Sequence, residues 1–153
     1  MEIKFITNRE DHQVSFPRAT IKECKEYLNT LDIIGLDTEN SSLYPLHANR
    51  LLLQLGDDKL TYVIDRTSVD INWLNEFKHK KFIGQNIKYD YMILKVDGVE
   101  LRNLEDLMVT EQCLGLGSGR KNSLDAIIER RLGTQATYAK NTRDEFINAR
   151  LGF

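Results

Sequence analysis

An apolar run without polar alternation, Asp32-Ile33-Ile34-Gly35-Leu36-Asp37, limits the possible folds of this chain more than any other segment. A strand with apolar side chains on both sides is typical of the centre of a sheet that is covered on both faces. Such sheets belong to α/β proteins, in which helices form the covering layers. The run therefore predicts a central strand, buried on both faces, in an α/β fold.

Three neighbouring segments support the same fold class. Thr20-Ile21-Lys22-Glu23 has the spacing of a capping box and predicts a helix that runs to about Leu31. The apolar runs Leu51–Leu55 and Leu60–Ile64 predict two strands, and the Gly56-Asp57-Asp58-Lys59 link between them is typical of a turn. We expect these two strands to form an antiparallel hairpin.

The second half of the chain alternates short strands with helices. The expected elements are a short helix near Ile71–Phe77, a strand at Lys81–Gly84, a helix from about Tyr89 to Val96, a short strand near Leu101–Leu104, and helices at Leu107–Leu114 and Ser123–Leu132. Together with the first half, this pattern predicts an α/β fold: a mixed sheet of about five strands, flanked by helices.

Composition agrees with a soluble globular protein. The 153 residues fit one domain, taken as residues 1–153, and the chain has neither a bilayer-length apolar stretch nor the apolar core of a secretory signal. Cys24 and Cys113 are isolated, which argues against a disulfide framework or a zinc site. The net charge of −2 argues against a dedicated double-strand DNA binder, although carboxylate-bound cations can still contact phosphate. We expect a cytoplasmic protein (in the host cytoplasm if the chain is viral) with no membrane partner.

Asp37-Thr38-Glu39, at the end of the apolar strand, is the first candidate site. Asp37 and Glu39 occupy alternate positions of a strand, so their carboxylates lie on one face. Neighbouring like charges are unfavourable unless a cation lies between them, and hard divalent ions prefer such an all-oxygen environment. The alternative is an exposed loop in which both carboxylates are solvated.

Gln85-Asn86-Ile87-Lys88-Tyr89-Asp90, directly after another predicted strand, is the second candidate site. Ligand sites in open α/β sheets gather at the carboxyl ends of strands, and both candidates occupy such ends. The structural alternative is that Asn86 caps the following helix and Asp90 interacts with its dipole. Asp106, after the next short strand, is either a further carboxylate near the same cleft or the N-cap of the following helix.

The two motifs Asp37-Thr38-Glu39 and Gln85–Asp90, at this distance from each other, resemble the first two motifs of the DEDD 3′–5′ exonucleases. The sequence is most similar to the proofreading domain of family A (polymerase I type) DNA polymerases, with ribonuclease D close behind. The resemblance extends through Ile83–Leu114 and Asn122–Gly133, so it covers most of the chain.

This resemblance implies an RNase H-like fold that holds two divalent cations, Mg²⁺ or Mn²⁺. It implies that Asp37 bridges both ions, that Glu39 binds the ion that activates water, and that Asp90 holds the second ion. Two such ions clamp the attacking and leaving oxygens of an in-line phosphoryl displacement. The implied product is a nucleoside monophosphate released from a 3′ end.

The resemblance also implies substrate contacts at Thr38, Leu43 and Asn86. Leu43 matches a leucine that wedges against the terminal base, and such a wedge selects frayed ends because unpairing costs less there. The alternatives are that Leu43 is an ordinary loop hydrophobe and that the nearby Lys88 is a solvated charge. The implied partner is the single-stranded 3′ end of DNA or RNA, which these motifs do not distinguish.

The third motif of the family, Tyr-x-x-x-Asp or His-x-x-x-Asp on a late helix, does not follow Asp90. Tyr138 and Asp144 have the wrong spacing, because on a helix they lie on different faces. Residues 142–153 resemble the stretch before this motif, so we expect a domain that is incomplete at its C-terminus and belongs to a longer chain, such as one with a polymerase domain. The alternatives are a helix supplied by another chain, or a nucleic-acid-binding or interaction module without turnover.

Overall fold

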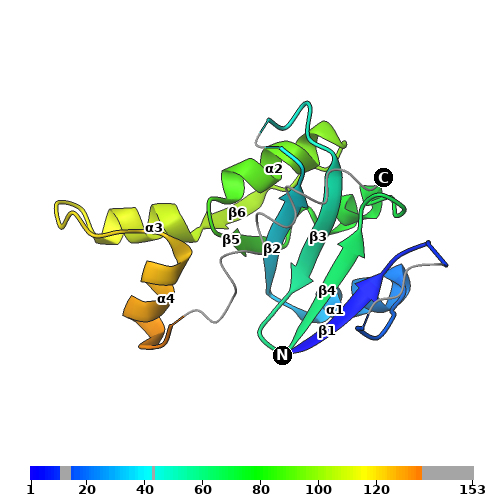
Figure 1. The fold of residues 1–153 in the computed structure, drawn as a ribbon, viewed down its shortest axis with the longest axis horizontal. Helices are drawn as coiled ribbons and strands as arrows, with labels where there is room; N and C mark the ends of the chain where they lie inside the picture. The colour runs from blue at the N-terminus through cyan, green and yellow to red at the C-terminus, as the bar shows by residue number, and fades with distance from the viewer. Residues whose placement is uncertain (11–14, 43, 136–153) are drawn as a thin grey trace.

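The computed structural model describes residues 1–10, 15–42 and 44–135, which form a six-stranded mixed sheet with helices packed against it (Figure 1). The strands are β1 (Glu2–Ile6), β2 (Ile33–Asn40), β3 (Arg50–Gly56), β4 (Leu60–Asp65), β5 (Lys81–Gly84) and β6 (Asn103–Asp106), in the sheet order β1-β4-β3-β2-β5-β6. β3 is antiparallel to both of its neighbours, whereas the pairs β1–β4, β2–β5 and β5–β6 are parallel. The carboxyl ends of five strands therefore meet at one edge of the sheet.

Helical segments separate and follow several of these strands. They are α1 (Ile21–Thr30), the 3₁₀ helix η1 (Asn72–Phe77), α2 (Ile87–Val96), α3 (Leu107–Leu114) and α4 (Leu124–Leu132). Thr20 and Glu23 form the predicted capping box at the start of α1. None of the helices in the described part of the chain has the length and apolar character that a bilayer crossing requires.

The hydrophobic core lies on one face of the sheet. Ile34 and Leu36 of β2 point into it, together with Leu53 and Leu55 of β3, and all four side chains are at most 5% exposed. Residues of α1, η1 and α2 complete the same cluster, among them Leu28, Leu74 and Leu94. The opposite face is more open, and Ile33 of β2 is 46% exposed on it.

The prediction that the central strand is buried on both faces is therefore wrong. Along β2 the side chains alternate between buried and partly exposed positions, although the sequence reads as one apolar run. The difference arises because Gly35 has no side chain and because Ile33 is apolar but exposed, so the sequence alone hides the alternation. The expected position of this strand at the centre of the sheet is confirmed.

The expected α/β fold and the hairpin of β3 and β4 are confirmed, with three differences in detail. β1 was not predicted, because its partner β4 is distant in sequence and the segment carries no local turn signal. The strand expected near Leu101–Leu104 lies at Asn103–Asp106, and the expected helix near Ile71–Phe77 is a 3₁₀ helix. α3 and α4 extend beyond the β6 edge of the sheet (Figure 1).

Candidate functional site

The first candidate motif lies within β2, near its carboxyl end. Asp37 and Glu39 belong to the open face of the sheet, as their alternate spacing predicts, and Asp37 is exposed. Gln54, the cross-strand partner of Asp37 on β3, donates from Nε2 to Asp37 Oδ2 at 3.3 Å. The two carboxylates therefore sit in regular strand backbone, and the alternative of an exposed loop is wrong.

Thr38 joins the two motifs. Its backbone N–H and its hydroxyl both donate to Asp90 Oδ1, at 3.0 Å and 2.6 Å. Asn40 Nδ2 donates in turn to Thr38 Oγ1 at 2.9 Å. Asp90 is 4% exposed and comes from the first turn of α2, so a residue distant in sequence is fixed directly against the Asp37–Glu39 strand.

The electrostatics of Asp90 are unusual for a carboxylate. Its pKa is raised to about 6, chiefly by burial and also by the negative charge of Asp37, against the opposing effect of the hydrogen bonds from Thr38. The effect of Asp37 indicates that the two carboxylates are close enough to repel each other. A bound cation would offset both the cost of burying the charge of Asp90 and its repulsion from Asp37.

Asn86 occupies the N-cap position of α2, but it does not act as a cap. Its backbone is left-handed, with φ 56° and ψ 40°, and its side chain makes no capping hydrogen bond. A capping side chain needs extended backbone at this position. The alternative in which Asn86 is an ordinary helix cap is therefore wrong, and its exposed amide remains available for other contacts. Lys88 is exposed, as a solvated charge would be.

Asp106 is the N-cap of α3, which was one of its two predicted roles. Its Oδ1 accepts from the backbone N–H of Met108 at 2.9 Å, and the same oxygen accepts from the backbone N–H of Asn86 at 3.0 Å. The second bond was not foreseen, because it depends on the parallel register of β5 and β6, which aligns Gly84 with Asp106. A side chain on Gly84 would meet the backbone oxygen of Leu36 at 2.7 Å, so this glycine permits the close approach of β5 to β2.

Several neighbours of the site were missed from the sequence. Tyr89 donates from its hydroxyl to the backbone oxygen of Ser42, which ties the segment after β2 to α2. Gln54 could not be assigned because the register of β2 and β3 includes a bulge near Asn40. Leu43, Tyr138 and Asp144 lie outside the described residues.

The residue types at this edge suit a hard divalent cation, because the donors are carboxylate oxygens with a repelling pair among them. In the described ranges, no group of three or more His, Cys, Asp or Glu side chains is gathered closely enough to hold a metal ion. Asp37 and Glu39 lie on the open face, whereas Asp90 approaches Thr38 from the core face. The oxygen donors are thus of the kind that a divalent cation prefers, although their side chains do not converge on one point.

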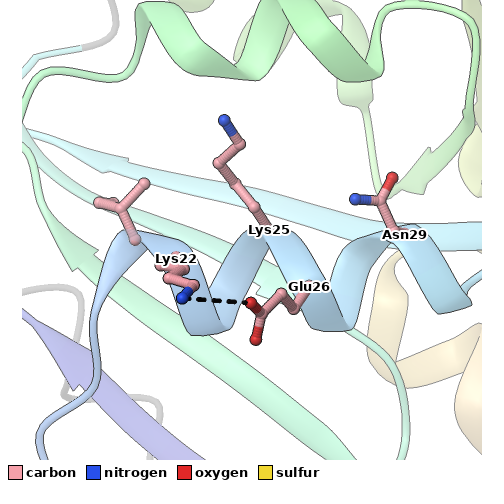
Figure 2. A pocket seen from close by; sticks show the side chains of 5 residues that line it. Lys22, Lys25, Glu26 and Asn29 are labelled. Atoms are coloured by element: carbon pink, nitrogen blue, oxygen red, sulfur yellow. Dashed lines mark ion pairs between the residues drawn. The ribbon is translucent and has the colours of Figure 1, made fainter.

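Two surface hollows in the described part of the chain are lined by none of these carboxylates. Figure 2 shows one of about 360 Å³ on α1, lined by Ile21, Lys22, Lys25, Glu26 and Asn29. An ion pair between Lys22 and Glu26 crosses it at 4.0 Å. Because it contains none of the predicted site residues, we place the candidate site at the carboxyl edge of the sheet on the strength of the Thr38–Asp90 contacts.

Comparison with known proteins adds a family match. A protein family described as 3′-5′ exonuclease matches residues 13–149. DNA polymerase I of Aquifex aeolicus is 26% identical over 147 residues, which is 94% of this chain. The chain spans only 22% of the length of that polymerase.

Solved structures show the same fold. Brucella melitensis NrnC with bound Mg²⁺ aligns with a TM-score of 0.68 at 16% identity, covering 97% of this chain and 74% of NrnC. Escherichia coli RNase D, described as an exoribonuclease involved in structured RNA processing, aligns with a TM-score of 0.65 at 18% identity, covering 97% of this chain and 41% of RNase D. These alignments agree with the predicted fold class.

Proposed function

Since the chain belongs to the 3′–5′ exonuclease family, we propose that it removes nucleoside monophosphates from single-stranded 3′ ends of DNA, as the proofreading domain of a DNA polymerase I-type protein. The family match and the similarity to a DNA polymerase I support this assignment. The observation that carries it is the pair of hydrogen bonds from Thr38 to Asp90, which joins the two carboxylate motifs at one edge of the sheet.

In this proposal Asp37, Glu39 and Asp90 hold the divalent cations, Mg²⁺ or Mn²⁺. When bound, such ions lower the pKa of a water molecule and neutralise charge on the phosphodiester. Asp37 and Glu39 supply carboxylates from the open face of the sheet, where a nucleic acid strand has access. Thr38 holds Asp90 by its Oδ1 and thereby fixes the position of this carboxylate.

The substrate contacts in this proposal come from the loop after β2 and from the start of α2. The Asn86 amide is exposed and free of a capping role, so it can donate to an oxygen of the substrate backbone. Leu43 is the proposed wedge against the terminal base, and Thr38, near the end of β2, is a further proposed contact. A polymerase domain on the same longer chain is the proposed source of the substrate end.

An RNase D-like activity on RNA is the second candidate function. The fold likeness to Escherichia coli RNase D supports it. The third candidate is a module that binds nucleic acid without turnover.

Digestion of 3′-labelled single strands of DNA and RNA, with Mn²⁺ or Mg²⁺, tests these three candidate functions in one experiment. We expect metal-dependent release of mononucleotides from DNA, lost by at least about 100-fold in Asp37→Ala, because a carboxylate that holds the ions is removed. Asp58→Asn, an exposed change at the β3–β4 turn, is the matched control and should leave the rate unchanged.

The other outcomes discriminate among the candidates. Release from RNA in preference to DNA would favour the RNase D-like function. Binding of single strands without any release would favour the module without turnover. Release that persists in Asp37→Ala would refute the proposed site.

A further inference from the structure

Asn86 is held in a backbone conformation that few residues adopt. Among the described residues it is the one non-glycine position with positive φ. A left-handed backbone at a residue other than glycine is unfavourable, although Asn tolerates it better than most. Neighbouring contacts must therefore hold this conformation in place.

Two contacts from outside the turn supply this restraint. Asp106 Oδ1 accepts from the Asn86 backbone N–H at 3.0 Å. Gln85, the preceding residue, donates from Nε2 to the backbone oxygen of Asn122 at 2.9 Å. The turn between β5 and α2 is thus held by the start of α3 and by the segment before α4.

The shared oxygen of Asp106 links this restraint to a second element. The same Oδ1 accepts from Met108, so the first turn of α3 and Asn86 of the second motif are both bound to one atom. The hydrogen bonds of the Asp106 side chain go to the backbone of Asn86 and of Met108. Its influence on the site therefore passes through Asn86.

We propose that Asp106 is a positioning residue, which keeps Asn86 left-handed so that its amide stays out of the helix cap and contacts the backbone of the bound single strand. This inference rests on the proposed function, because it requires a nucleic acid strand at the site. Without the Asp106 acceptor, Asn86 relaxes to extended backbone, in which its side chain caps α2 and is lost to the substrate.

Binding of a fluorescent single-stranded oligonucleotide, with Ca²⁺ in place of Mg²⁺ so that cleavage does not intervene, tests the inference. Asp106→Ala should weaken binding roughly tenfold, whereas Asp106→Asn, which retains an acceptor oxygen, should stay within about threefold of the wild type. Asn86→Ala should weaken binding by about as much as Asp106→Ala. Added to Asn86→Ala, the Asp106→Ala change should have almost no further effect, because the two act as one unit.

Two further measurements separate positioning from loss of structure. Hydrogen exchange of the Asn86 amide should accelerate in Asp106→Ala and stay slow in Asp106→Asn, since only the latter keeps the acceptor. The affinity for Mn²⁺ should be the same in all these variants, because the three carboxylates are untouched. A variant that merely unfolds would lose oligonucleotide binding and Mn²⁺ binding together.

The outcomes distinguish the inference from the function on which it rests. No oligonucleotide binding by the wild-type chain would refute the proposed function, and the inference with it. Binding by the wild type that is undiminished in Asp106→Ala, or fully additive effects of the two alanine changes, would refute the inference alone. An equal loss in Asp106→Asn would show that charge, and not the acceptor oxygen, matters, which also overturns it.

Discussion

The sheet with α1 and α2 and the arm formed by α3 and α4 are stabilised in different ways. In the sheet, Leu53 and Phe82 are fully buried and belong to a continuous apolar layer. In the arm, Leu114, Leu116 and Leu132 are 63%, 86% and 72% exposed. Apolar burial therefore stabilises the first region much more than the second.

Polar contacts replace apolar packing in the arm. Glu111 of α3, itself 5% exposed, accepts from Arg130 at 3.0 Å and from Arg131 at 2.6 Å, and these contacts join α3 to α4. Two hydrogen bonds hold the arm to the rest of the molecule: Gln85 donates to the backbone oxygen of Asn122, and Met108 at the start of α3 donates to Asp106 at the end of β6. The sheet is therefore held by apolar packing, whereas the arm is held near the candidate site by a few hydrogen bonds and ion pairs.

The largest expected effect contrasts one substitution in the two regions. Leu53→Ala should lower the free energy of unfolding by about 2 to 5 kcal/mol, because it leaves a cavity in the apolar core on one face of the sheet. Leu116→Ala, the same change at an exposed position, should alter it by no more than about 0.5 kcal/mol. Urea unfolding of both variants measures the two values. A similar loss of unfolding free energy in both variants would contradict this contrast, because it would show that the arm also depends on apolar burial.

A smaller effect is expected from Asp90→Asn in the absence of metal. The folded-state pKa of about 6 lies above the ordinary carboxyl value of 3.8, so the folded protein binds this proton more tightly than the unfolded chain does. The contribution of this group to stability is thus fully present below about pH 4 and is lost as the pH rises through 6. Above that pH, the ionised carboxylate costs roughly 3 kcal/mol, which the amide avoids while its Oδ1 still accepts from Thr38.

We therefore expect Asp90→Asn to melt at a higher temperature than the wild type at pH 8 and to approach it near pH 4. Added Mn²⁺ should raise the melting temperature of the wild type and have little effect on the variant. Asp58→Asn, an exposed carboxylate, is the control. A wild type and a variant with parallel pH profiles would argue that Asp90 is not buried as a costly charge.

The smallest effect concerns the arm and should remain local. The hydrogen bonds from Arg131 and Arg130 lower the pKa of Glu111, so the contribution of this ion pair is present above the ordinary carboxyl pKa and is lost as the pH falls through the lowered value. Glu111→Gln should speed amide exchange in α4 at neutral pH and leave exchange in β2 and β3 unchanged. Faster exchange throughout the sheet would show that the arm and the sheet unfold as one unit.

Local signals in the sequence were sufficient for much of the fold. The capping box at Thr20 and the turn between β3 and β4 act within a few residues, so they could be recognised without the structure, and both are confirmed. The motif resemblance also indicated the 3′–5′ exonuclease family correctly. β1 and the open face of β2 depend on long-range pairing and on which face the helices cover, and a single sequence does not encode these in any local pattern.

The features of the candidate site also fall into those that a local pattern predicts and those that depend on long-range pairing. The spacing of Asp37 and Glu39 predicted their common face, because alternation is a property of one strand. The left-handed backbone of Asn86 and its bond to Asp106 could not be predicted, since they require the register of β5 against β6. The roles of Asp37, Glu39 and Asp90 as metal ligands remain predictions for the experiments above.

Asp90 also bears on how chains of this kind change over generations. Asp and Asn codons differ by one nucleotide, and an amide at this position keeps both bonds from Thr38 while it removes a charge from the protein interior. Where nothing selects for the carboxylate, mutation and drift therefore lead towards the amide. Under the proposed function, selection retains the acid at position 90, and a descendant released from catalysis is expected to lose it before it loses the fold.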